Sequence, residues 1–220
     1  MAIAFGTAAN NGSSGTSPVT VTVTINNGDT GVAVISLTAR NTTPDAVTSL
    51  TGGGTWALRV ALTVGLERVE VWSTAAGAAT AASSVDVAFG TTDLDAVCCF
   101  VGTWTGALGL GVTGTASGST ANPSITTTTQ DNNNWVIAGF ACLEGGVPTV
   151  NTANLRSARH QPGAVNHNGS GAMTDQTAVS PGSVVNDCIQ TANSWVAAAL
   201  ELRTVAGGAP PVRPVIFVPI

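Results

Sequence analysis

Hydrophobic and polar residues alternate along much of the chain, most regularly over 18–25, where valine and threonine take turns. A period of two predicts a β-strand with one buried face. Asn26-Asn27-Gly28-Asp29 follows as a strong turn signal, so residues 31–38 are the expected hairpin partner. Further strands are expected at 55–64, 68–72, 84–89, 96–101, 124–127, 134–141 and 195–202, with a weak one around 173–177.

The spacing of these strands predicts the fold class. Turns rich in Gly, Asn and Asp separate them, and no segment of helical length shows a 3.6-residue period. This pattern predicts an all-β protein, an antiparallel jelly-roll-like β-sandwich with extended N- and C-terminal arms. Residues 153–159 fit a short strand or a helical turn. We find no fixed-period repeat and expect one body. The expected division is an N-terminal arm (1–17), the sandwich (18–203) and a linker with a C-terminal docking arm (204–220).

The C-terminal segment combines a tether with an apolar end. Residues 206–211 are flexible and then stiff, and the apolar side chains that follow them gain nothing from exposure to water. Pro214 and Pro219 bracket four residues, which suits an added edge strand because proline cannot donate to a β-ladder. Extended at about 3.3 Å per residue, the segment after Arg203 reaches about 55 Å. We expect it to dock on a neighbouring subunit through Val215, Ile216, Phe217, Val218 and Ile220.

The composition limits the classes of partner. Of the 220 residues, 44% are hydrophobic and only 9% are charged, which is typical of membrane proteins or of proteins with buried interfaces. Thr, Ser, Asn and Gly interrupt the apolar runs, so a membrane-spanning segment is not expected. The net charge is −5 and the seven basic residues, all arginine, are scattered, which argues against nucleic-acid binding. Interfaces with other protein subunits remain.

The N-terminus and the surface composition suggest where the protein works. Residues 1–5 have neither a basic region nor a long apolar stretch, so no signal peptide is expected. The Thr/Ser/Asn/Gly-rich composition is nevertheless typical of proteins that function outside a cell. A virion component, made in the host cytoplasm and released by lysis, reconciles the two observations. A cytoplasmic β-protein is the alternative.

Four cysteines lie at Cys98, Cys99, Cys142 and Cys188, without a C-x-x-C pair. Buried free thiols are the favoured interpretation. Disulfides, including one between subunits, are the alternative. Because adjacent residues of a strand point to opposite faces, we expect one of Cys98 and Cys99 to face the core and the other to face solvent or a neighbour.

Other candidate constellations have simpler interpretations. His160 and His167 lie seven residues apart in an expected loop, and the runs 93–95 and 131–134 fit turns as well as calcium ligands. Glu67, Glu70 and Glu144 are the carboxylates considered for glycoside hydrolysis, but an ion pair between Glu70 and Arg68 is the favoured role. We therefore expect no catalytic site, no metal site and no cofactor.

Five tryptophans without a tyrosine raise the possibility of a carbohydrate platform. All five lie in or next to expected strands, where aromatic side chains usually belong to the core: Trp56, Trp72, Trp104, Trp135 and Trp195. Trp72 is the exception we single out, because it shares a strand face with Arg68 and Glu70. These three residues form the expected surface contact, for a sugar or for a subunit.

Two segments carry a family resemblance. The first begins with a Gly-rich turn and a Trp strand (47–56), continues with Val69-Glu70-Val71-Trp72 and ends with residues 85–89. In the second, Asn134-Trp135 is matched near the end of the chain by Asn193-Ser194-Trp195. This order resembles the jelly-roll sandwiches common among structural proteins of tailed bacteriophages, over residues 18–203. The resemblance implies a virion protein, such as a capsid decoration or head-fibre protein.

These observations together favour a non-enzymatic virion protein that binds a capsid surface and self-associates. The expected partners are a major capsid protein or another virion protein, and further copies of the chain itself in a homotrimer. A carbohydrate-binding module of a phage fibre or a cell surface is the alternative.

Overall fold

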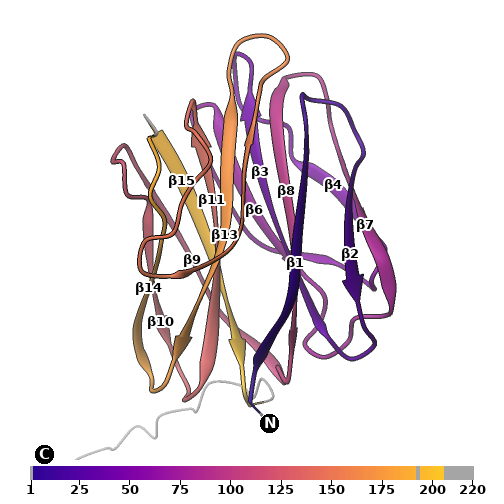
Figure 1. Cartoon of the computed structure of the whole chain (residues 1–220), viewed down its shortest axis with the longest axis vertical. Helices are drawn as coiled ribbons and strands as arrows, with labels where there is room; N and C mark the ends of the chain where they lie inside the picture. The colour runs from indigo at the N-terminus through magenta and orange to yellow at the C-terminus, as the bar shows by residue number, and fades with distance from the viewer. Residues whose placement is uncertain (1, 192–193, 206–220) are drawn as a thin grey trace, which may run out of the picture.

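Four antiparallel sheets stack face to face in the computed structural model, which describes residues 2–191 and 194–205 (Figure 1). Two five-stranded sheets form the middle layers, and smaller sheets cover them on either side. The strands are β1 (Ala4–Ser13), β2 (Val19–Ile25), β3 (Thr30–Ala39), β4 (Val47–Thr51), β5 (Ala57–Val64), β6 (Glu67–Ser73), β7 (Ala82–Phe89), β8 (Leu94–Thr105), β9 (Gly109–Gly118), β10 (Ser124–Thr129), β11 (Asn134–Leu143), β12 (Asn154–Gln161), β13 (Gly169–Ala178), β14 (Gly182–Asp187) and β15 (Ser194–Arg203).

Three apolar cores separate the four layers. The first lies between the sheet β2-β7-β4 and the sheet β1-β8-β3-β6-β5, the second between the two five-stranded sheets, and the third between β12-β13-β11-β15-β9 and the pair β10-β14. Strands of the outer sheets have one covered face and keep the alternating pattern, as β2 and β10 do. Strands β3, β8, β11 and β15 are covered on both faces, so their sequences are almost continuously apolar.

The two halves of the chain repeat one arrangement. In the first half the large sheet has the order β1-β8-β3-β6-β5, and in the second half β9-β15-β11-β13-β12 follows the same order with counterpart strands. The pairs β2-β7 and β10-β14 correspond as well, and only β4 has no counterpart among the described residues. The sequence shows no fixed-period repeat, because this repeat lies in strand order and pairing rather than in residue identity.

The all-β antiparallel sandwich is confirmed, whereas the jelly roll is not specifically established. A jelly roll divides eight strands between two four-stranded sheets. Here β5 pairs with β6, and β12 with β13, so each half places five strands in its large sheet. The segment with two expected conformations, residues 153–159, forms most of the edge strand β12. The described residues contain no helix long and apolar enough to cross a membrane.

The expected N-terminal arm was wrong, because residues 4–13 form the edge strand β1, which pairs with β8 from Ala4 opposite Thr105 to Ser13 opposite Val97. Small residues dominate this strand because neighbouring side chains approach it closely. A Cβ atom at Gly12 would collide with the side chain of Arg159 on β12. Residues with a loop-like composition therefore form a strand in which Gly6 and Gly12 have no room for a side chain. The docking-arm residues 215–220 lie outside the described residues.

Candidate interface groove around Trp135

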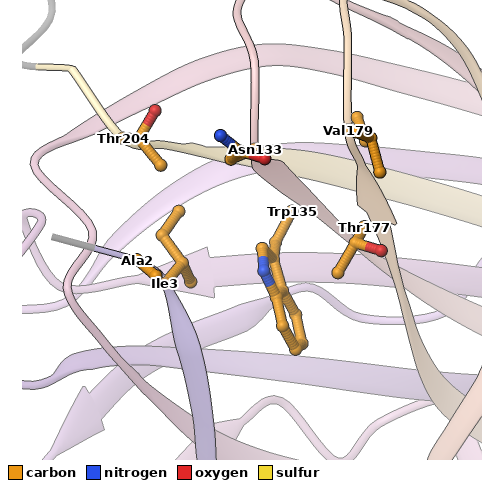
Figure 2. A pocket seen from close by; sticks show the side chains of 8 residues that line it. Ala2, Ile3, Asn133, Trp135, Thr177, Val179 and Thr204 are labelled. Atoms are coloured by element: carbon orange, nitrogen blue, oxygen red, sulfur yellow. The ribbon is translucent and has the colours of Figure 1, made fainter.

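A groove of about 620 Å³ opens at the end of the sheets where β1 begins and β15 ends (Figure 2). Figure 2 shows the Trp135 side chain in its centre, with Ile3 on one side and Thr177 and Val179 on the other. The lining side chains are apolar or uncharged and polar: Ala2, Ile3, Asn133, Trp135, Thr177, Ala178, Val179 and Thr204. Such a lining suits the binding of an apolar or neutral segment more than a charged one.

Trp135 is held rigidly at the start of β11. It is half-buried and packs against the core between the two large sheets. The Arg156 guanidinium lies 5.8 Å from the centre of its ring and 4.1 Å from the centre of the Phe5 ring. Asp175, which is buried, fixes that guanidinium by accepting a 2.7 Å hydrogen bond from its Nε. A fixed cation therefore supports the indole, which lowers the entropy cost of using it as a contact surface.

The point where the chain leaves β15 is tied to the same groove. The backbone N–H of Thr204 donates to Oδ1 of Asn134 at 3.1 Å, and its hydroxyl donates to the carbonyl of Asn132 at 2.9 Å. Arg203 donates through Nε to Asp131 at 2.6 Å. The turn before β11 and the first residue of β11 thus fix the position of Thr204, from which the C-terminal segment starts.

A second hollow of about 300 Å³ continues the groove along the turn between β13 and β14. The two share Thr177, Ala178 and Val179 in their linings. Val179 marks the junction and is 79% exposed, the highest value among the large apolar side chains of the described residues. Exposure of this kind at the junction of two hollows is typical of a contact surface for a partner.

Arg68, Glu70 and Trp72 lie together in one hydrogen-bonded cluster, in which Glu70 is buried while Arg68 and Trp72 are partly exposed. Glu70 is fully buried and accepts hydrogen bonds from Arg68 Nε at 2.6 Å and from Trp72 Nε1 at 2.7 Å. It also accepts a 3.1 Å bond from the backbone N–H of Val47 at the start of β4. The expected ion pair is present. Glu70 itself cannot contact a partner, because the segment that carries β4 covers it.

All four cysteines are buried with free thiols, so the favoured interpretation agrees with the structure and the disulfide alternative does not. Burial raises the pKa of the Cys98 and Cys188 thiols to about 12. The expectation that one of Cys98 and Cys99 would face solvent or a neighbouring subunit was wrong. Cys98 belongs to the core between the two large sheets and Cys99 to the neighbouring core, since β8 is covered on both faces.

The buried carboxylates bind backbone amides of loops and, at Val112, of the edge strand β9. Asp95 accepts bonds of 2.6 to 2.7 Å from the N–H groups of Val165, Asn166 and His167. Burial opposes ionisation of Asp95, but these amides stabilise the anion more, so its pKa lies below the usual value. Glu201 accepts bonds from the N–H groups of Val112 and Gln130 and from the amide of Asn134. These acids therefore hold the connections between strands in place.

His160 lies in β12 rather than in the expected loop, and its buried Nδ1 has no hydrogen-bond partner within the described part of the chain; the other candidate residues have protein partners. Asp93 accepts two bonds from Thr42, and Asp131 pairs with Arg203, which agrees with the turn interpretation of both acidic runs. His167 lies 3.0 Å from Glu144 through Nδ1. Among the described residues no group of three or more His, Cys, Asp or Glu is placed to hold a metal ion.

Sequence reasoning assigned Trp135 to the core and missed the groove. The available signal was its position directly after the turn 131–133, which places it at the end of a strand and near the rim of the sheet.

No known protein family, curated protein or solved structure matches the chain.

Proposed function

We propose that the chain is a non-enzymatic structural subunit of a virion, a decoration-type protein that binds a capsid surface and joins copies of itself through its C-terminal arm, residues 204–220. The observation that carries the proposal is that the buried acidic side chains all bind groups within the fold. Glu67, Glu70, Asp95, Asp175, Asp187 and Glu201 are all buried, and each binds backbone amides, arginine or other side chains within the fold.

General acid–base catalysis needs a titratable group at a substrate site. The groove around Trp135 is lined by apolar and neutral polar residues instead. This contrast favours binding over catalysis. The stack of four sheets, with an apolar core between each pair of layers, supplies the rigidity that a subunit of a large assembly needs.

The C-terminal segment supplies the means of joining subunits. It starts from a fixed point at Thr204 and contains the apolar residues 215–218 behind a flexible and then stiff linker. Only 9% of the residues in the whole chain are charged, so few charged groups would have to be desolvated when a neighbouring subunit binds. A homotrimer on a capsid surface is the proposed assembly.

The self-association is tested by comparing the full chain with a variant that ends at Thr204. Sedimentation equilibrium should give an oligomer for the full chain and a monomer for the variant, with identical far-UV circular dichroism. Equal oligomer masses for both chains would refute the role of the arm.

The virion assignment is tested by co-expressing the chain with the structural genes that neighbour its own gene. Failure to co-sediment with the resulting particles would remove that assignment.

A carbohydrate-binding module is the second candidate, and one observation now favours a different residue for it. Trp135 is half-exposed beside Asn133, Thr177 and Thr204, which combine a stacking surface with hydrogen-bonding groups. The N–H of Trp72, in contrast, is bound to Glu70. Glycan binding that disappears in Trp135→Ala and persists in Trp72→Phe, by a chain that stays monomeric, would support this candidate over the first.

A further inference from the structure

We infer that the groove around Trp135 is the receptor for the proline-rich C-terminal segment, residues 209–220, of a second copy of the chain. The inference rests on the proposed function and adds the site at which the arm binds. Three features carry it: the chemistry of the segment, the lining of the groove, and the place where the chain leaves the folded body.

The segment has the composition of a ligand for an aromatic groove. Its sequence from Ala209 to Pro214 is Ala-Pro-Pro-Val-Arg-Pro, so Pro211 and Pro214 stand in the P-x-x-P spacing. Such sequences favour the polyproline II conformation, which exposes proline rings for contact with aromatic side chains and leaves backbone carbonyls free to accept hydrogen bonds. The conformation is largely set before binding, so little chain entropy is lost on docking.

The groove offers the complementary groups. The Trp135 ring, supported by Arg156, provides the stacking surface, and Ile3 and Val179 provide apolar walls. The hydroxyl of Thr177 and the amide of Asn133 are placed in the lining, where they can donate to the free carbonyls of the segment. Beyond Val179 the groove continues along the β13–β14 turn, which provides room for the residues that follow Pro214.

The geometry of departure favours a second copy over the chain's own segment. Thr204 lines the groove, and only five residues, 205–209, separate it from Pro210. Extended, these five residues span at most about 17 Å, so a stiff segment that follows them has little length in which to turn into its own groove. A proline-rich stretch favours an extended form of about 3.1 Å per residue, which corresponds to about 19 Å over six residues such as 209–214. The segment therefore reaches a neighbour more readily than it returns.

Variants of the full chain test the groove. Val179→Asp places a charge on an exposed side chain, so the fold should be kept, and Trp135→Ala removes the stacking surface. Val147→Asp is the matched control, because Val147 is 57% exposed and lies in the loop that follows the opposite end of β11. Each of the first two should weaken self-association about tenfold or more in sedimentation equilibrium, while the control behaves as wild type. Wild-type association of both groove variants would overturn the inference.

A mixing experiment tests whether binding occurs between copies. The variant that ends at Thr204 keeps the groove and lacks the segment, whereas Trp135→Ala keeps the segment and lacks the groove. Each should be monomeric alone, and the truncated chain should bind a synthetic peptide of residues 206–220, observed by tryptophan fluorescence. A mixture of the truncated chain with Trp135→Ala should form a complex through the one intact groove and the one intact segment.

The remaining outcomes are also decisive. If the peptide binds the truncated chain while the full chain is monomeric at every concentration, the segment occupies its own groove and the second copy is excluded. If the groove binds glycans and not the peptide, the inference is overturned in favour of a carbohydrate site. If truncation leaves assembly intact, the proposed function fails. If truncation abolishes assembly but the groove variants do not, only the assignment of the groove fails.

Discussion

Glu67 connects the two halves of the molecule through a single carboxylate. It lies at the start of β6 and accepts hydrogen bonds from the backbone N–H of Leu143 on β11, at 2.7 Å, and from the hydroxyl of Ser194 on β15, at 2.9 Å. Burial raises the pKa of Glu67 to about 7, although both hydrogen bonds favour the anion. The carboxylate therefore titrates near neutral pH inside the folded protein.

This raised pKa predicts a pH-dependent stability. The folded protein binds the Glu67 proton more tightly than the unfolded chain, whose ordinary pKa is 4.5. The resulting stabilisation is complete below pH 4.5 and is lost as the pH rises to about 7, with an upper limit of about 3 kcal/mol. Glu67→Gln removes the titration and keeps the shape of the side chain. The unfolding free energy of wild type, relative to the variant, should fall across this window in urea denaturation. A difference that stays constant with pH would contradict the assignment.

Single residues show how far the sequence predicts chemistry. The pairing of Arg68 with Glu70 follows from their spacing on one strand face and is confirmed. The burial of Glu70 could not be predicted, because the covering segment at Val47 comes from another part of the chain. The same reason applies to Cys98 and Cys99: the sequence indicates opposite faces, but only the stacking of sheets shows that both faces are covered.

At the scale of strands, β1 is the clearest test of the fold. Ile3, just before it, is buried, which is worth about 2 kcal/mol, and Phe5 meets Trp104 edge to face at a centroid distance of 5.6 Å. Deletion of residues 1–13 should therefore lower the unfolding free energy by more than about 2 kcal/mol, because β8 also loses a paired edge. Thermal denaturation checks this. An unchanged transition temperature would mean that these residues act as the arm that their composition suggested.

The strands that composition predicts well are those with one covered face. Hydrophobic and polar residues alternate strictly in β2, and this pattern alone predicts both ends of the strand to within one residue. β9 was missed, because its Gly, Thr, Ala and Ser residues resemble a loop. It is an edge strand next to β15, where Gly118 lies against the ring of Trp195 and a larger residue would collide. Edge strands made of small residues therefore lack the alternating hydrophobic pattern by which strands are predicted. The same reason explains why β1 was not predicted.

The candidate groove lies at a place that only the assembled molecule defines. Ile3, Trp135, Val179 and Thr204 come from four segments far apart in the sequence. The tail that we propose as its ligand was identified from the sequence alone, because its proline and apolar content contrasts with the body. The receptor could not be identified in that way, since it depends on how β1, β11, β13 and β15 end beside one another.

At the scale of the whole molecule, the two halves pack through reciprocal contacts. β1 lies against β12, and the corresponding strands β5 and β9 also lie against each other. β3 and β11 face each other across the middle core. The arrangement therefore has an internal approximate two-fold symmetry. Each large sheet has one face covered by the small sheet of its own half and the other face covered by the opposite half.

This arrangement predicts what happens when the chain is divided between Gly106 and Ala107, in the connection from β8 to β9. Either half alone would expose the middle core, which includes Val34, Phe100, Ile137 and Leu200. Each should therefore aggregate or form homodimers when expressed alone. Co-expressed halves should recover the sheet-to-sheet contacts and give a 1:1 complex with the circular dichroism of the intact chain. If each half were instead a stable folded monomer, checked by sedimentation and thermal denaturation, the middle core would be dispensable. The protein would then be two independent sandwiches joined by a linker rather than one stack of four sheets.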